Sequence, residues 1–161
     1  AVDMCRVMEL EDLLHVRYVE LPELLNQSDI ITLHLPATDD THHMIDADAF
    51  SQMRDGVCLV NTARGELIDS GALLDALKSG KVAHALLDVL EHEQNFEENA
   101  ELISHENVVT TPHIAFYADE SMRNMYLDCF ESIDTFMKSE DPEHIVELPT
   151  LVCDMKGVKR S

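Results

Sequence analysis

The sequence has few basic residues and no long apolar run, and each shortage excludes a class of function. Lys and Arg together number 11 against 32 Asp and Glu, which gives a formal net charge of −21. A surface this acidic repels phosphate backbones and anionic lipid headgroups, so we expect no nucleic-acid or membrane partner. No apolar run approaches the roughly 18 residues of a membrane span. A dinucleotide is still compatible, because backbone N–H groups at a helix start can hold a pyrophosphate.

Several familiar motifs are absent as well. The five glycines form neither G-x-G-x-x-G nor a P-loop, and H-E-x-x-H, paired C-x-x-C and G-x-S-x-G are missing. The four cysteines are irregularly spaced, and Cys58 and Cys129 lie in apolar patterns. This indicates thiols in a reducing, cytoplasmic setting rather than a disulfide framework. Because His42 and His43 cannot both face one ion from a regular element, we expect no metal site.

Four short apolar runs rich in β-branched residues indicate strands. Their starts lie 28, 27 and 23 residues apart, which suits crossover connections rather than hairpins. Continuous apolar runs are typical of parallel strands buried on both faces. The runs are residues 29–35, 57–62, 84–89 and 107–111, with residues 1–4 and 16–19 as candidates for two more. The expected fold class is α/β, with a doubly wound, mostly parallel sheet.

Helix signals fill the gaps between these runs. Pro22 suits a first helical position, whereas Asp46 and Asp69 (or its neighbour Ser70) can cap the next two helices. Apolar residues at three- and four-residue steps predict a long helix over 119–137, and its Met-rich stripe is expected to be packing surface. The acidic stretch 91–106 is typical of a solvated loop.

Three residues that can do chemistry follow neighbouring runs. Arg64, Glu93 and His113 are expected at the carboxyl ends of the strands, where open α/β sheets bind ligands. Arg can hold a substrate carboxylate in a bidentate fork, His can exchange a proton with a keto or hydroxyl oxygen, and a carboxylate can orient the imidazole. Taken singly, such residues are usually a surface ion pair, a solvated acid and a cap. Together they predict a reaction on a small 2-oxo or 2-hydroxy acid, with hydride from a cofactor.

Three segments resemble signatures of the D-isomer-specific 2-hydroxyacid dehydrogenases, in that family's order and spacing. The segments are VNTARGEL (60–67), LLDVLEHE (86–93) and TTPHIAFY (110–117). The likeness runs from about residue 1 to 145. It implies a Rossmann-type sheet, NAD as the cofactor and a catalytic triplet of Arg64, Glu93 and His113.

The resemblance also implies which residues hold the cofactor. Asp88 would meet the nicotinamide carboxamide, and His34, Pro36 and Thr62 would line the dinucleotide groove. Asp3 is similar to the acidic residue that holds the adenosine ribose hydroxyls. A carboxylate there favours NAD over NADP, because it repels a 2′-phosphate.

Phe116, with Tyr117 and the segment MRNM (122–125), is most similar to the D-lactate dehydrogenase branch. The resemblance implies that Phe116 walls a pocket for a small side chain and that pyruvate is reduced to D-lactate. The alternative is the C-terminal-binding-protein branch of NAD-binding corepressors, which residues 42–45 and 52–54 echo. That branch carries Trp in place of Phe116, which favours the enzyme.

The chain departs from the family at its start. The Gly-rich phosphate loop and the N-terminal substrate-domain segment of the family are missing, which suggests a chain that begins inside a larger protein. Residues 1–137 are expected to be most of the dinucleotide-binding domain, truncated before its second strand and ending in a long crossover helix. Residues 138–161 are expected to return to a substrate domain. We expect no turnover by this chain alone, and a homodimer because the family usually dimerises through this domain.

Overall fold

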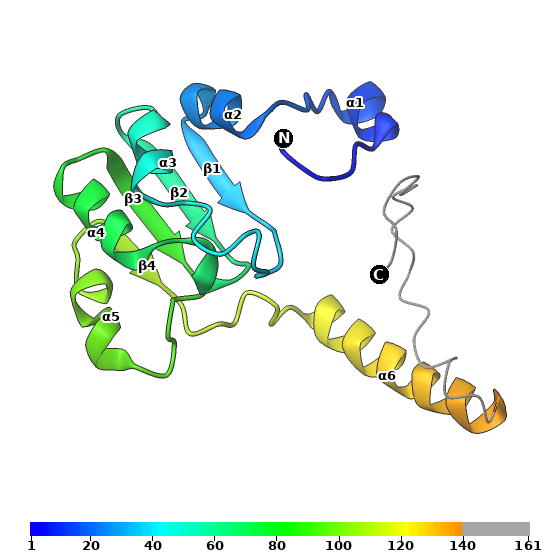
Figure 1. Ribbon diagram of the computed structural model, residues 1–161. Helices are drawn as coiled ribbons and strands as arrows, with labels where there is room; N and C mark the ends of the chain where they lie inside the picture. Colours follow the sequence, from blue (N-terminus) through cyan, green and yellow to red (C-terminus); the bar gives the residue numbers. More distant parts are fainter. Residues whose placement is uncertain (140–161) are drawn as a thin grey trace. The chain divides into compact units, whose positions relative to one another are not determined.

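Contacts between residues divide the chain into two units. The computed structural model describes residues 1–139 (Figure 1). The larger unit is Val19–Ala115, and the smaller one holds residues 1–18 together with the described residues from 116 onward. The predicted domain boundary at residue 137 therefore stays a prediction, because nearly all of the predicted tail lies outside the described residues.

A four-stranded parallel sheet forms the centre of the larger unit. The strands are β1 (Ile30–Leu33), β2 (Val57–Asn61), β3 (Val82–Leu87) and β4 (Val108–Thr110), in the spatial order β1-β2-β3-β4 (Figure 1). Every neighbouring pair is parallel, and a helix lies between each strand and the next. The helices are α2 (Leu21–Gln27), which precedes β1, then α3 (Ala47–Gln52), α4 (Ser70–Lys78) and α5 (Phe96–Ile103). The predicted parallel α/β fold is confirmed.

The predicted helix starts are confirmed in detail. The carboxylate of Asp46 accepts a hydrogen bond from the N–H of Ala49 at 2.9 Å, at the start of α3. Asp69 caps α4 in the same way, with the N–H of Ala72 at 2.9 Å. Each cap satisfies an N–H group that has no partner inside its helix. Pro22 lies in the first turn of α2, where its missing N–H costs nothing.

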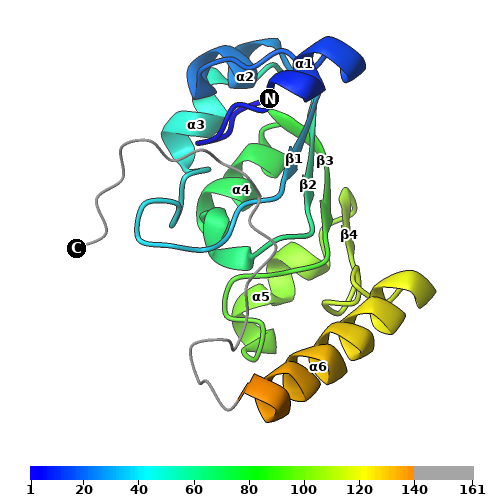
Figure 2. The ribbon, with the colours of Figure 1, turned by 90° about the vertical axis from the view of Figure 1, so that its right-hand side faces the viewer.

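The core of this unit lies on one face of the sheet. Figure 2 shows α3, α4 and α5 on the same side of the strands, and their residues pack with Leu25 of α2 against Leu59 of β2. On the opposite face Ile30, Leu86 and Val109 are 67%, 40% and 61% exposed. Within the described residues, the expectation that the strands are buried on both faces is therefore wrong for β1, β3 and β4. Within the described residues of this unit, no second layer of helices covers the other face.

Helix α5 contradicts the expectation that residues 91–106 form a solvated loop. The side chain of Asn95 caps the helix by accepting from the N–H of Glu98, and the acidic first turn suits the positive end of the helix dipole. Leu102 and Asn99 are each 4% exposed, so the helix has a buried face. The acidic residues occupy the outer face and hid this short amphipathic pattern.

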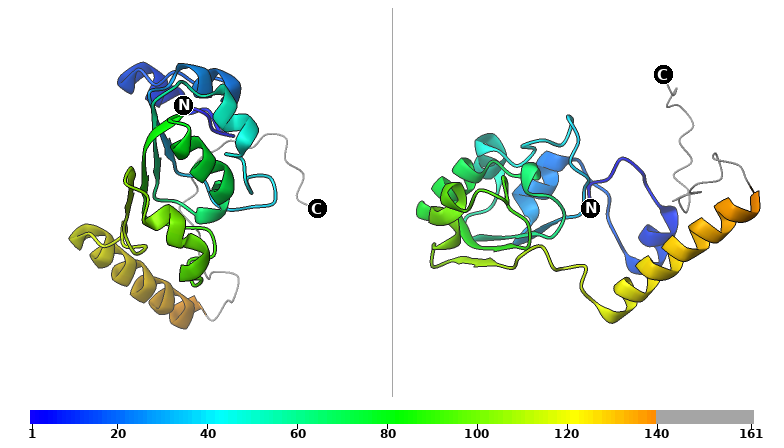
Figure 3. Two further views of the ribbon diagram at one scale, coloured as in Figure 1. Left: turned by 90° about the vertical axis from the view of Figure 1, so that its left-hand side faces the viewer. Right: turned by 90° about the horizontal axis from the view of Figure 1, so that it is seen from below.

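The smaller unit contains α1 (Met8–Leu14) and α6 (Asp119–Ser139), which is one unbroken helix (Figure 3). The long helix predicted over 119–137 is confirmed, but its stripe is exposed: Phe130 and Met137 are 67% and 72% accessible. Residues 1–4 and 16–19 are not strands, and α1 lies between them. A strand requires a ladder of backbone hydrogen bonds with a neighbour.

Residues 1–139 contain three cysteines. Cys58 and Cys129 carry free thiols, as expected, whereas Cys5 is disulfide-bonded. The expectation of free thiols in place of disulfides is therefore wrong for Cys5. None of the helices described is both long and apolar enough to cross a membrane.

Candidate active site

The ends of the four strands lie in register and form one edge, which we call the carboxyl edge. Asn61 pairs with Leu33 on one side and Leu87 on the other, and Leu87 pairs with Thr110. Neighbouring strands lie about 4.8 Å apart. The next residue of each strand therefore begins a loop at this edge, and these four residues are His34, Thr62, Asp88 and Thr111. Arg64, Glu93 and His113 all follow within these loops, as predicted.

His113 and Glu93 form a direct pair at the carboxyl edge. Nδ1 of His113 lies 3.0 Å from Oε2 of Glu93. Because a carboxylate only accepts, Nδ1 carries the hydrogen and Nε2 is left to act on a substrate. The two side chains are 45% and 41% exposed, so the pair is accessible to a ligand. His113 has a φ of +54°, a left-handed conformation that is uncommon outside glycine and clusters at functional sites.

Asp88 anchors the loop that carries His113. Its carboxylate accepts from the hydroxyl of Thr111 and from the N–H groups of Ile114 at 2.9 Å and Ala115 at 2.8 Å. Its carbonyl also accepts from the N–H of His113 at 2.8 Å. Burial alone would raise the pKa of Asp88, but these hydrogen bonds stabilise the ionised form and hold its pKa below the usual value. The sequence predicted this residue as a cofactor contact and gave no sign of its anchoring role.

A cavity of about 330 Å³ opens beside the pair. Its lining combines Glu93 and His113 with Asp88 and the apolar side chains of Pro112 and Phe96. An apolar wall with a few converging polar groups is typical of a small-molecule site.

The loop after β2 carries Arg64 and is fixed by a fully buried asparagine. Nδ2 of Asn61 donates to the carbonyl of Arg64 at 2.8 Å, and Oδ1 accepts from the N–H of Ala63 at 3.0 Å. Asn61 is 0% exposed, while the Arg64 guanidinium lies at the surface and donates to the Ala63 carbonyl at 2.7 Å. Asn61 was not among the predicted site residues, although a polar residue at the end of an apolar run indicates a buried group that must be hydrogen-bonded.

Gly65 brings the Arg64 loop against the loop after β3. A Cβ atom at residue 65 would lie 2.1 Å from the backbone carbonyl carbon and oxygen of Leu90. Only glycine permits this approach. The backbone that follows Arg64 therefore touches the backbone that leads to Glu93, which places both loops side by side at the carboxyl edge.

The predicted groove residues share a second cleft of about 490 Å³. His34, Pro36 and Thr62 line it together with Arg64, with Leu35, Ala37 and Ala63 between them. The Thr32 hydroxyl lies 2.9 Å from Nε2 of His34, which orients that ring. The structure thus brings Arg64 together with the predicted dinucleotide residues, while the cavity of His113 is a separate hollow.

Two predicted residues belong to the smaller unit. The Asp3 carboxylate accepts from the N–H of Cys5 at 2.8 Å in a local turn. Phe116 is 51% exposed and meets Tyr117 edge to face, with ring centroids 6.2 Å apart. Their roles at the ribose and in the substrate pocket stay predictions.

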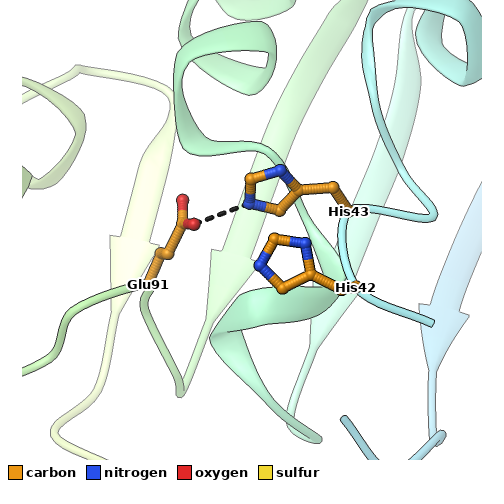
Figure 4. A group of neighbouring side chains, drawn as sticks. All are labelled: His42, His43 and Glu91. Atoms are coloured by element: carbon orange, nitrogen blue, oxygen red, sulfur yellow. Dashed lines mark hydrogen bonds and ion pairs between the residues drawn. The ribbon is translucent and has the colours of Figure 1, made fainter. Parts of the chain in front are cut away.

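His42 and His43, which were predicted not to face one ion from a regular element, lie close together here. The ligand atoms of His42, His43 and Glu91 all lie within 4.8 Å of one another (Figure 4). In a regular strand, successive side chains point to opposite faces and would diverge. Here the two histidines lie in a turn, and His43 has a φ of +50°.

The family comparison decides what this arrangement belongs to. The sequence profile of the D-isomer specific 2-hydroxyacid dehydrogenase, NAD binding domain, matches residues 2–115. This chain belongs to the D-isomer-specific 2-hydroxyacid dehydrogenase family. The match includes every predicted site residue except Phe116, so the resemblance to this family is confirmed, together with an NAD-binding domain.

Relatives and solved structures of the family agree. The chain is 46% identical to D-lactate dehydrogenase of Treponema pallidum over 135 residues, covering 76% of this chain and 41% of that protein. It is 47% identical to an aromatic 2-oxoacid reductase of Clostridium sporogenes over 123 residues, covering 69% of the chain and 37% of the relative. The D-lactate dehydrogenase from Aquifex aeolicus, complexed with NAD and lactic acid, superposes with a TM-score of 0.77 at 38% identity, over 89% of this chain and 47% of that one.

The chain spans less than half the length of these relatives. The profile match establishes the family and the NAD-binding domain for this chain. Because the chain covers only part of its relatives, the activity of a whole enzyme remains a proposal.

Proposed function

We propose that this chain is the NAD-binding part of an oxidoreductase that reduces a small 2-oxo acid to the D-2-hydroxy acid, with pyruvate and D-lactate as the main pair. The observation that carries the proposal is the His113–Glu93 pair. Its nitrogen and oxygen lie 3.0 Å apart at the carboxyl edge of the sheet, within the residues that match the family's NAD-binding domain. A histidine held by a carboxylate is the proton donor and acceptor that this chemistry needs.

The described residues suit the nicotinamide half of the cofactor. The cleft of His34, Pro36 and Thr62 opens at the carboxyl ends of parallel strands, where doubly wound sheets bind dinucleotides. We propose that these residues flank the cofactor and that one oxygen of Asp88 receives its carboxamide, with Asp3 at the ribose. NADH, when bound, supplies the hydride that no side chain can provide.

In the proposed mechanism, Arg64 binds the substrate carboxylate and polarises the neighbouring carbonyl. Its planar fork makes two parallel hydrogen bonds to a carboxylate, which also sets the orientation of the acid. His113 donates a proton from Nε2 to the keto oxygen, and Glu93 stabilises the imidazolium before that transfer. In the reverse direction His113 accepts the hydroxyl proton. Phe116 is proposed to restrict the pocket to a small side chain.

The relatives do not identify which side chain the 2-oxo acid substrate carries. Proteins described as a D-lactate dehydrogenase and an aromatic 2-oxoacid reductase match this chain at 46% and 47% identity. The NAD-binding part therefore does not separate these substrates, and pyruvate is proposed on the resemblance of residues 116–125 to the lactate branch.

The test measures NADH oxidation by the whole enzyme that contains this chain, with pyruvate and phenylpyruvate as competing substrates. We expect a higher kcat/KM with pyruvate, and loss of turnover with either acid in His113→Ala. NADH binding without turnover of any 2-oxo acid would reject the proposal and favour a corepressor-like binding protein. We expect no turnover by the isolated chain, and measurable turnover there would contradict that part.

The assembly and location of the enzyme are proposed on the family resemblance alone. We propose a homodimer that works in the cytoplasm. Sedimentation equilibrium of the enzyme would give twice the monomer mass, and a monomer at micromolar concentration would overturn the dimer.

A further inference from the structure

Three side chains that no step of the proposed reaction uses converge in the loops after β1 and β3. The imidazole rings of His42 and His43 are stacked with centroids 3.9 Å apart, and Nε2 of His43 lies 2.6 Å from Oε1 of Glu91 (Figure 4). All three ligand atoms fall within 4.8 Å of one another. We infer that His42, His43 and Glu91 form a binding site for a divalent transition-metal ion of the zinc class.

The spacing of the ligand atoms suits such an ion. Zinc binds nitrogen and oxygen ligands at about 2.1 Å in a tetrahedron, which places neighbouring ligand atoms about 3.4 Å apart. Nε2 of His43 and Oε1 of Glu91 lie 2.6 Å apart, and no pair of ligand atoms in the group is more than 4.8 Å apart, so all three are close enough to reach one ion. The stacked imidazole rings must rotate so that one nitrogen of each ring faces the ion. Three protein ligands leave the fourth position to water.

Hydrogen bonds hold the turn of the two histidines and the carboxylate of Glu91. The N–H of His42 donates to the carbonyl of Thr38 at 2.9 Å, and the N–H of His43 donates to the carbonyl of Glu66 at 2.8 Å. The second oxygen of Glu91 accepts from the N–H of Ser70 at 3.4 Å. A site whose ligands are positioned before the ion arrives loses little entropy on binding.

The protonation states also suit a metal ion. Burial would raise the pKa of Glu91, but the hydrogen bonds from His43 and Ser70 outweigh it and lower the pKa, so the carboxylate is ionised. An ion at this position would take the place of the hydrogen between Nε2 of His43 and Oε1 of Glu91.

The donor set decides the class of ion. Two imidazoles and one carboxylate suit Zn²⁺, Co²⁺ or Ni²⁺, whereas Mg²⁺ and Ca²⁺ prefer oxygen ligands alone. The net charge of −21 raises the local concentration of cations generally, so selectivity must come from the histidines. A bound ion would tie the turn at residues 41–44 to the loop that carries Glu93.

The test titrates the metal-stripped chain with Zn²⁺ by isothermal calorimetry, and with Co²⁺ by visible absorption, in a buffer that does not chelate metals. Loss of one ligand should weaken the affinity by about tenfold or more. We expect that loss in His42→Ala and in Glu91→Gln. His84→Ala removes an exposed histidine from β3 and should bind like the original chain. Excess Mg²⁺ should not compete.

Circular dichroism and thermal unfolding separate loss of the site from loss of the fold. His42 is exposed, so His42→Ala should keep the spectrum of the original chain. Zn²⁺ should raise the unfolding temperature of the original chain and of His84→Ala more than that of His42→Ala, because an ion that binds the folded state stabilises it. Absence of binding, or equal binding by the original chain, His42→Ala and Glu91→Gln, would overturn the inference. Neither readout involves NAD or substrate, so the proposed dehydrogenase function stands or falls separately.

Discussion

Nδ1 of His113 lies 3.0 Å from Oε2 of Glu93, across 20 residues of sequence, and so joins the loop after β4 to the loop after β3. The pairing directs Nε2 away from the carboxylate and fixes which nitrogen carries the hydrogen. His113 has a φ of +54°, and its loop is held by the buried Asp88, so the ring position is determined by the fold. The proposed general acid and the carboxylate that orients it are thus paired without any ligand.

Glu93→Gln should lower kcat while leaving NADH affinity nearly unchanged. The amide can still orient the ring, but it no longer stabilises the imidazolium by charge, so the proton donor is weakened. We expect a smaller loss of kcat than in His113→Ala, where removal of the acid should cost about 10²–10⁴-fold. Stopped-flow turnover and NADH fluorescence titration measure the two quantities.

His84→Ala is the matched control for these variants, because His84 is exposed on β3 and belongs to neither cavity. Its kinetics should equal those of the original enzyme. Equal losses of kcat and NADH affinity in His113→Ala would contradict a role in proton transfer.

Arg64→Lys should raise the KM for the 2-oxo acid much more than it lowers kcat. Arg64 lines the cleft of His34 and Thr62, on a loop that Asn61 holds in place. The ammonium group of Lys is a point charge, so it cannot bind both carboxylate oxygens of the substrate as a planar fork does. Loss of a bidentate pair should cost about tenfold or more in kcat/KM. Arg54→Lys, at an exposed arginine paired with Asp29 at 2.7 Å, is the matched control. Unchanged pyruvate kinetics in Arg64→Lys would refute the proposed contact.

Much of this fold was predictable because its signals are local. The strands follow from short β-branched runs, and the helix starts follow from Asp46 and Asp69, whose caps need only a nearby N–H. The sharing of one edge by Arg64, Glu93 and His113 follows from parallel topology alone. The family resemblance then supplied roles that no spacing argument could give.

The unpredicted features depend on contacts between distant segments. Helix α5 was missed because its acidic outer face dominates the composition, while only Leu102 and Asn99 reveal the buried side. His42 and His43 come together because His43 has a left-handed backbone conformation in a turn. A prediction from helix or strand periodicity assumes regular backbone angles and so misses this arrangement. The apolar runs led to the expectation that both faces of the strands are buried. An apolar run alone does not show whether the helices of this unit cover one face of the sheet or both.

Asp88→Asn should destabilise the larger unit and should do so in a pH-dependent way. The carboxylate accepts from Thr111, Ile114 and Ala115, and hydrogen bonds to a charged group contribute about 1.5–3 kcal/mol each. The amide can still accept part of them, so we expect a loss of about 2–4 kcal/mol near neutral pH. Urea unfolding followed by circular dichroism measures it.

The pH dependence follows from the direction of the Asp88 pKa shift. Its pKa in the folded state is lowered, so its stabilisation is present above the unfolded value of about 3.9 and is lost as pH falls through the folded value. The difference between the original chain and Asp88→Asn should therefore shrink below about pH 4. Asp55→Asn, at a carboxylate paired with Lys81 at the surface, is the control and should change stability little. A difference that stays constant down to pH 3 would contradict the assignment.

Gly65→Ala should destabilise the larger unit because the two loops that carry Arg64 and Glu93 touch at this residue. The added Cβ would lie 2.1 Å from the Leu90 carbonyl carbon and oxygen, and a backbone group cannot rotate away as a side chain can. Overpacking of this kind costs about 1–3 kcal/mol, and more where the backbone is fixed at both sides. Gly71→Ala is the matched control, since its Cβ would lie 3.3 Å from a single Asp69 side-chain oxygen. We expect the urea midpoint of Gly65→Ala to fall well below that of Gly71→Ala, and the KM for the 2-oxo acid to rise as Arg64 moves away from the Glu93 loop. Equal midpoints for the two variants would show that the loops separate freely, and the close contact between them would then not be what positions Arg64.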